Sequence, residues 1–216
     1  MEKTNIQCFN QKAKELPSFI EKQNSGKPYL NYGHNNQYPQ YLWELYLKSA
    51  ILQSIINGSV DYVMGNNLQT TIAIADKVNK DLETLEDIVK KLATDYFIFG
   101  GFAMQVIFNK LGDIAELYWL DFRNIRLDKE SKKAYYSDDW VGHSKDFITY
   151  DLFDTNKRTG TSVFYFNGHI SRGVYPIPRY IGALAAIETS TEISKFHLNS
   201  ILNNFSSNFI INFNNG

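Results

Sequence analysis

Apolar side chains recur at intervals of three and four residues in two long stretches of the chain. The first stretch begins at Pro39, which the first turn of a helix tolerates, and ends before Gly65. Its apolar positions are Leu42, Leu45, Leu52, Ile56, Val60 and Val63. This periodicity predicts one unbroken helix of about seven turns up to Gly65.

The second stretch follows Pro176 and Pro178, each of which fixes φ and biases the residue before it away from the helix. We expect a second long helix from Arg179 to Ser206. Its apolar positions are Ile181, Leu184, Ile187, Ile193, Phe196, Ile201 and Phe205, and its polar positions include Glu188, Glu192 and Lys195. The last residues, FIINFNNG, have the pattern of a strand that enters a turn.

A shorter helix and a set of strands are predicted between these two. Thr84 and Asp87 have the spacing of a capping box at the start of a helix over Leu85–Phe99. The run FAMQVIFN, the turn 110–113 and the run IAELYWL predict an antiparallel hairpin. Further strands are expected at 68–75, Ile125–Leu127, Ala134–Tyr136, Phe147–Asp151 and Ser162–Phe166.

The fold class is therefore α+β, with two long helices flanking a small mixed or antiparallel sheet. Residues 1–37 are polar and rich in Asn, Pro and Gly, and they read as an extended N-terminal arm with a short helix around Gln11–Lys22. Such an arm is either loose or packed on a neighbouring subunit. Residues 38–216 form the α+β domain, which we expect to be incomplete and to continue in a longer protein.

The composition of the chain excludes or disfavours several classes of function. Lys and Arg number 22 against 23 Asp and Glu, which disfavours tight wrapping of DNA but does not exclude a near-neutral wall past which DNA slides. Cys8 is the single cysteine, so an internal disulfide and a multi-cysteine zinc site are excluded. The N-terminus lacks the apolar segment of a secretion signal, and the apolar run Tyr96–Phe108 is too short to span a bilayer.

The sequence contains no recognisable catalytic, cofactor-binding or metal-binding motif. His34, His143, His169 and His197 are far apart and lack partners at ligand spacing, and His197 is interpreted as a packed or interfacial residue. Ser25-Gly26-Lys27 lacks the other residues of a phosphate-binding loop. We therefore expect neither enzymatic activity nor a cofactor.

Two sets of side chains leave a second interpretation open. The acidic residues Asp113, Glu116, Asp121, Asp128, Asp138 and Asp139 are either turn residues or ligands of a divalent cation in an enzyme. The aromatic residues Phe97, Phe99, Phe102, Phe108, Tyr118, Trp119 and Phe122 either pack in the core and interfaces or stack on bases. Turns are favoured for the acidic set because Asp is a turn-favouring residue. Packing is favoured for the aromatic set because it follows an apolar strand pattern without interleaved Lys or Arg.

Three segments resemble the portal proteins of tailed bacteriophages. Residues 31–67 are similar to the family's first wing helix, with "N-x-Y-P" followed by "I-I-N". Residues 100–127 resemble its passage from helix to hairpin, with a step of small residues before the first strand. Residues 174–216 are similar to its proline-led helix, in which Y-P-x-P precedes F-H-x-N. The segments follow the family order and cover about half of the chain.

The resemblance implies the N-terminal wing of a ring subunit, typically one of twelve copies, at one vertex of the capsid. Double-stranded DNA would pass through the ring during packaging and ejection without sequence-specific binding. The implied partners are the major capsid protein, the terminase motor and the tail adaptor. The product would be made in the bacterial host cytoplasm, by a phage or a prophage, and would reside in the virion.

In this family the stem and clip follow the point at which this sequence ends, so the fragment is expected to contribute wing structure. The alternatives are another non-enzymatic virion or adaptor protein, or the divalent-cation enzyme. Apolar residues on the exposed side of the second long helix are expected to mediate association, although the sequence does not assign individual interface residues.

Overall fold

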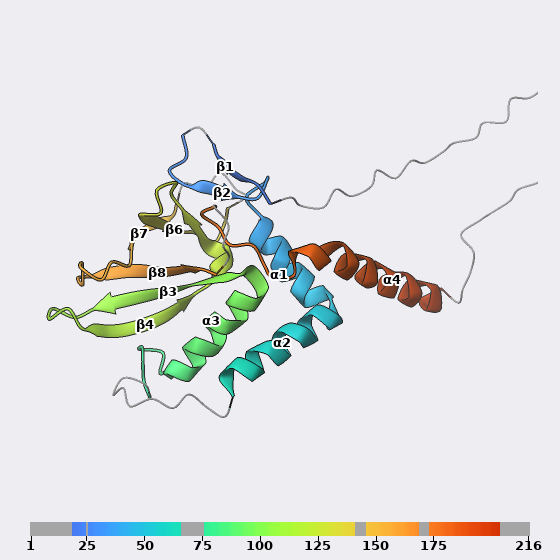
Figure 1. Ribbon diagram of the computed structural model, residues 1–216, viewed down its shortest axis with the longest axis horizontal. Coiled ribbons are helices and arrows are strands. Elements are labelled where there is room, and N and C mark those ends of the chain that lie inside the picture. The colour runs from blue at the N-terminus through green and yellow to red at the C-terminus, as the bar shows by residue number, and fades with distance from the viewer. Residues whose placement is uncertain (1–18, 25, 66–75, 141–145, 169–172, 204–216) are drawn as a thin grey trace, which may run out of the picture.

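Six strands form one mixed sheet, the layer at the left of Figure 1. The computed structural model describes residues 19–24, 26–65, 76–140, 146–168 and 173–203. The strands of the sheet are β3 (Gly101–Phe108), β4 (Ile114–Leu120), β5 (Ile125–Leu127), β6 (Lys133–Tyr136), β7 (Ile148–Leu152) and β8 (Thr161–Asn167). Their order is β4-β3-β8-β7-β6-β5, and β7 and β8 pair in parallel while the other neighbours are antiparallel. The predicted hairpin and the α+β class are confirmed.

Helix α3 (Leu85–Phe99) covers part of this sheet. Its first turn has the predicted capping box, in which the Thr84 hydroxyl accepts a hydrogen bond from the Asp87 backbone N–H and the Asp87 carboxylate accepts one from the Thr84 backbone N–H. Ile88 and Leu92 lie on one face and pack in a buried cluster with Val106 of β3. The sequence prediction of this helix is confirmed.

Gly100 ends α3 and makes the turn into β3. Its φ of +86° lies in the left-handed region that favours glycine. A Cβ atom here would lie 2.5 Å from the carbonyl oxygen of Ile177, so the segment before the last helix can approach only because the side chain is missing. This contact joins the two halves of the chain.

The first long helix is two helices, and the prediction of one unbroken helix was wrong. Helix α1 (Tyr38–Lys48) and helix α2 (Ala50–Met64) meet at Ser49, which has an extended backbone with ψ of 105°. Its hydroxyl accepts a hydrogen bond from the Leu52 N–H at 3.3 Å and thereby caps α2. The Tyr46 hydroxyl donates to Asn57 at 2.7 Å across the bend. Serine at this position therefore starts a new helix.

The described part of residues 1–37 packs on the body, which corrects the expectation of an extended arm for these residues. Strands β1 (Glu21–Gln23) and β2 (Leu30–Tyr32) form a small antiparallel sheet. Glu21 and Lys22 were expected at the end of a short helix, and they lie in β1 instead. Leu30 and Tyr32 are buried in the main core of the same chain. The division into domains at residue 37 stays a prediction.

Arg126 of β5 lies at the centre of the contact between this segment and the sheet, with 1% of its surface exposed. Its guanidinium donates to the carbonyl oxygens of Arg123 and Ile125 at 2.8 and 2.7 Å. It also donates to the side-chain and backbone oxygens of Asn36 at 2.5 and 2.6 Å. Burial lowers the pKa of Arg126 to about 10, so the side chain still carries its charge at neutral pH.

Two stacked tyrosines complete this buried network. The rings of Tyr32 and Tyr175 lie 4.2 Å apart with an interplanar angle of 8°. The Tyr32 hydroxyl donates to the Pro176 carbonyl oxygen at 2.6 Å, and the Tyr175 hydroxyl donates to the Leu30 carbonyl oxygen at 2.5 Å. The Leu127 N–H donates to the Tyr175 hydroxyl at 3.0 Å. Segments near residues 30, 126 and 175 are thus held together.

The last described helix is α4 (Leu184–Leu202), which follows a short 3₁₀ helix, η2 (Ile181–Ala183). It begins five residues later than predicted. Figure 1 shows that α4 projects away from the sheet, so it does not flank the sheet as expected. The predicted strand at 68–75, the N-terminal part of the helix around 11–22 and the segment from 204 onward lie outside the described residues.

The buried network predicts a large loss of stability in Arg126→Met. The substitution replaces the guanidinium group by an apolar side chain of similar length. The oxygens of Asn36, Arg123 and Ile125 then lose their hydrogen-bond donor. We expect the free energy of unfolding in urea to fall by about 3 kcal/mol.

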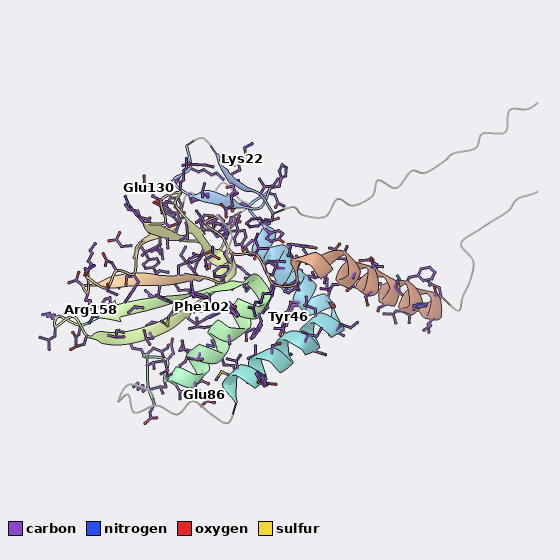
Figure 2. The ribbon with its side chains drawn as sticks, in the orientation of Figure 1. Lys22, Tyr46, Glu86, Phe102, Glu130 and Arg158 are labelled. Atoms are coloured by element: carbon purple, nitrogen blue, oxygen red, sulfur yellow. The ribbon has the colours of Figure 1, made fainter. Side chains whose placement is uncertain are left out.

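The matched control is Arg158→Met, because Arg158 is exposed at the tip of the sheet (Figure 2). This control is expected to change the free energy of unfolding by less than about 0.5 kcal/mol. Equal urea midpoints for Arg126→Met and the unmodified chain would contradict the account.

Candidate interaction surface

The acidic residues singled out in the sequence do not converge. Asp121 caps the short helix η1 (Phe122–Asn124) and binds Arg123, and Asp128 accepts two backbone N–H groups at 2.8 and 2.9 Å. Asp138 accepts from Asn124 at 3.1 Å. The turn interpretation is confirmed for these residues.

The remaining acidic residues are also separate. Glu116 accepts from the Tyr118 hydroxyl on β4, while Asp113 lies in the β3–β4 turn and Asp139 is exposed after β6. Within the described residues, no three His, Cys, Asp or Glu side chains are placed to hold a metal ion together. The geometry that favours a divalent-cation enzyme is therefore missing from this part of the chain.

The histidines do not gather either. His34 is exposed in the loop before α1, and His197 is exposed on α4 with its ring centroid 5.9 Å from that of Phe196. His197 is therefore not packed in the core, and an interfacial role stays a prediction. His143 and His169 lie outside the described residues.

The aromatic residues around α3 and the hairpin are packing residues. Phe99, Phe108 and Phe122 are buried, and the rings of Phe99 and Phe122 stack at 5.3 Å. Phe102 stacks on Phe166 of β8 at 5.0 Å. Phe97, Tyr118 and Trp119 are partly buried. The core interpretation is confirmed over the interpretation as an exposed platform for bases.

Asp95 is a buried carboxyl group with 3% of its surface exposed. Burial raises its pKa well above the usual range, and a hydrogen bond from the indole N–H of Trp119 at 2.7 Å opposes part of that increase. A raised pKa in a cleft is a feature of catalytic acids. Asp95 instead lies under Trp119 between α3 and the sheet, so we interpret it as a structural residue.

Helix α4 is held to the body only near its beginning. Leu184 and Ile187 pack against the main core, and the Glu188 carboxylate accepts a hydrogen bond from the Tyr41 hydroxyl of α1 at 2.8 Å. Burial, together with this bond, raises the pKa of Tyr41 above its usual range. None of the nineteen residues of α4 is buried.

The second half of α4 exposes large apolar side chains. We call Ile193, Phe196, Leu198, Ile201 and Leu202 the distal α4 face; all five are at least half exposed, and Phe196 is 68% exposed. A shallow hollow runs along the helix beside them, lined by Ala185, Glu188, Thr189, Glu192, Ile193 and Phe196. The sequence pattern marked Ile193, Phe196 and Ile201 as apolar positions but could not show that they lie uncovered.

A second exposed apolar stripe lies on α2. Its inward face buries Leu52, Ile56 and Val60. We call Ile51, Ile55 and Tyr62 the α2 face; they lie on the opposite side, and Tyr62 is 88% exposed. The sequence analysis missed this stripe, although the intervals of four residues from Ile51 to Ile55 and seven from Ile55 to Tyr62 are a helical signal in their own right.

The chain matches no protein-family model and no curated protein. Its fold is similar to that of a chain in the neck of an empty gene transfer agent particle computed with C6 symmetry, with a TM-score of 0.59, 9% identity and coverage of 76% of this chain and 47% of that chain. Chains in the virion of the native particle and in its neck computed with C12 symmetry give the same TM-score at 10% identity.

These two alignments also cover 76% of this chain, and 46% and 45% of the particle chains. The chain thus spans less than half the length of the structures that it matches. At this level of identity the likeness establishes a shared fold. Of the described helices, none has both the length and the apolar character needed to cross a bilayer.

The Asp95 environment predicts a pH dependence of stability that Asp95→Asn removes. The folded-state pKa lies above the unfolded value of about 3.9, so the folded chain binds the proton more tightly. The stabilisation is complete below pH 4 and is lost as the pH rises toward the folded-state pKa. The asparagine side chain does not titrate in this range, and its amide oxygen can still accept the hydrogen bond from the Trp119 indole N–H.

Urea unfolding at pH 4 to 7 measures this effect. We expect the stability of Asp95→Asn relative to the unmodified chain to increase by up to about 1.4 kcal/mol for each pH unit in this window. Parallel stability curves for the two chains would show that Asp95 is not protonated in the folded state.

Proposed function

We propose that this chain is a structural, non-enzymatic component of a phage-like virion, at the connection between head and tail. The observation that carries the proposal is the fold that it shares, over 76% of its length, with chains from the neck and virion of gene transfer agent particles. The distribution of side chains supports a role in assembly, since most of the exposed large apolar side chains of the described residues lie on helices.

More specifically, we propose the wing region of a portal subunit. The three sequence segments that resemble portal proteins occur in the family order. Their described residues fall on α1 and α2, on the turn after α3 with β3 to β5, and on the segment before α4 together with α4. One matched neck was computed with C12 symmetry, which suits a ring of twelve copies. The ring would stand at the capsid vertex, contact the major capsid protein, and bind the terminase and the tail adaptor.

The charge balance suits a DNA channel as well. A formal net charge of -1 leaves little electrostatic attraction to phosphates, so double-stranded DNA would slide past the ring during packaging and ejection. No step of this role requires a cofactor or sequence-specific contact. The protein would be synthesised in the bacterial host and incorporated into the virion.

The portal proposal predicts self-association of the full-length gene product and of this 216-residue chain. Light scattering coupled to size exclusion measures their masses. We expect the full-length product to have a mass of about twelve copies and the 216-residue chain to associate in a concentration-dependent manner. A strict monomer at all concentrations and salt levels would contradict the portal role and favour a monomeric adaptor.

A further inference from the structure

Glu21 of β1 binds the chain shortly before α4 begins. Its carboxylate accepts hydrogen bonds from the backbone N–H groups of Tyr175 at 2.7 Å and Val174 at 3.1 Å. Each of the two oxygens takes one donor, so the carboxylate holds two adjacent residues at once. Hydrogen bonds to an ionised group are stronger than those between neutral groups. The N-terminal hairpin is therefore attached to residues 153 and 154 positions later in the chain.

Gly173 allows the Glu21 carboxylate to approach the backbone. A Cβ atom at this position would lie 2.9 Å from the carboxyl carbon of Glu21, a distance that non-bonded carbon atoms do not tolerate. An alanine here would displace the carboxylate from the two N–H groups while leaving its charge in place.

Residues 173–180 depend on contacts of this kind, because they form neither a helix nor a strand. Two of them, Pro176 and Pro178, have no backbone N–H with which to join regular structure. Such a segment takes its position from the groups that bind its remaining N–H and C=O groups. The path of the chain into α4 is therefore determined by residues that lie far away in the sequence.

Further hydrogen bonds connect the same hairpin to the same segment. The Tyr32 hydroxyl donates to the Pro176 carbonyl oxygen at 2.6 Å, and the Tyr175 hydroxyl donates to the Leu30 carbonyl oxygen at 2.5 Å. Strands β1 and β2 thus bind three consecutive residues of the segment before α4. We call this set of contacts the clasp; its members are Glu21, Leu30, Tyr32, Val174, Tyr175 and Pro176.

Two other hydrogen bonds hold the chain near the start of α4. The Tyr180 hydroxyl donates to the Ile98 carbonyl oxygen at 2.8 Å, and the Tyr41 hydroxyl donates to Glu188 at 2.8 Å. Each is a single bond, about which the chain can rotate. The clasp combines four hydrogen bonds with stacked tyrosine rings and fixes three residues in a row. It is therefore the contact best suited to set a direction.

Helix α4 enlarges any change of direction at its start. It has nineteen residues and projects away from the sheet (Figure 1). The helix is therefore about 28 Å long, and a rotation of about 20° at its start moves its end by about 10 Å. A local rearrangement of the clasp thus becomes a large displacement at Leu202, where α4 ends.

We propose that the clasp is a conformational device that couples the N-terminal hairpin to the direction of α4. When the clasp is closed, α4 has the direction seen in the structure. When Glu21 is released, residues 173–180 and α4 rotate together. A partner that detaches the hairpin from the body therefore also redirects α4. This coupling holds whether or not the chain is part of a ring.

Distances between spin labels on α3 and α4 test the coupling. Lys90→Cys and Ser194→Cys place the labels at exposed positions on these two helices, neither of which contains a member of the clasp. Cys8→Ser removes the single native cysteine from this background. Pulsed electron paramagnetic resonance of the labelled chain with an intact clasp is expected to give one narrow distance distribution.

Two substitutions open the clasp from opposite sides. Glu21→Gln removes the charge and one of the two acceptor oxygens, and Gly173→Ala displaces the carboxylate. Each variant is expected to lose the single narrow maximum and to give distances spread over about 10 Å. Because both act on one contact, the double variant is expected to show no further broadening.

The matched controls make the same chemical changes elsewhere. Lys22→Gln neutralises the exposed neighbour of Glu21 in β1 (Figure 2). Gly58→Ala adds a Cβ in α2 where nothing lies within 4 Å. Both controls are expected to keep the narrow distribution. Equal broadening in the controls would show a general loosening of the chain and overturn the assignment to the clasp.

The remaining outcomes decide between the clasp and the contacts of α4 itself. A narrow, unshifted distribution in Glu21→Gln and Gly173→Ala would overturn the proposal. Broadening in Tyr41→Phe alone would assign the direction of α4 to the Tyr41–Glu188 bond instead. Circular dichroism is expected to show unchanged helix content in both clasp variants. Loss of the helical signal in both would mean that the clasp holds the fold as a whole, which contradicts a role confined to α4.

Discussion

The rest of the structure depends on the buried guanidinium of Arg126. It has four oxygen acceptors within hydrogen-bond distance, all from uncharged groups, and it holds Asn36 in a left-handed backbone conformation with φ of 62°. Burying a cation is costly unless its donors are satisfied, so this one geometry is strongly favoured over others. The N-terminal segment is thereby joined to the edge of the sheet, directly before α1 begins.

The same contact determines where α4 leaves the body. Tyr32 and Tyr175 stack beside Arg126. The carbonyl oxygen of Pro176, the residue after Tyr175, accepts a hydrogen bond from the Tyr32 hydroxyl. The chain then passes Gly100, where a missing side chain allows close approach, and enters α4. The start of α4 is consequently fixed against α1, while its second half projects with its apolar residues uncovered. A helix whose start is fixed to the body and whose second half projects is consistent with the proposed role in an assembly.

Features with short-range signals were predictable from the sequence, and features that depend on distant partners were not. The capping box at Thr84 and the β3–β4 hairpin are encoded within a few residues, and both are confirmed. Ser49 gave no distinct signal, because apolar periodicity continues through the bend that it caps. Arg126 binds an asparagine ninety residues earlier, which no local pattern reveals. Likewise, periodicity identified the apolar side of α4 but not what would cover it.

Electron microscopy of the negatively stained full-length product tests the central claim most directly, because it shows the symmetry of the assembly and not only its mass. The account predicts end-on views with a central channel and cyclic symmetry of about twelve copies. Particles with a single two-fold axis, or only monomers at every concentration, would contradict the claim that this chain is part of a ring subunit.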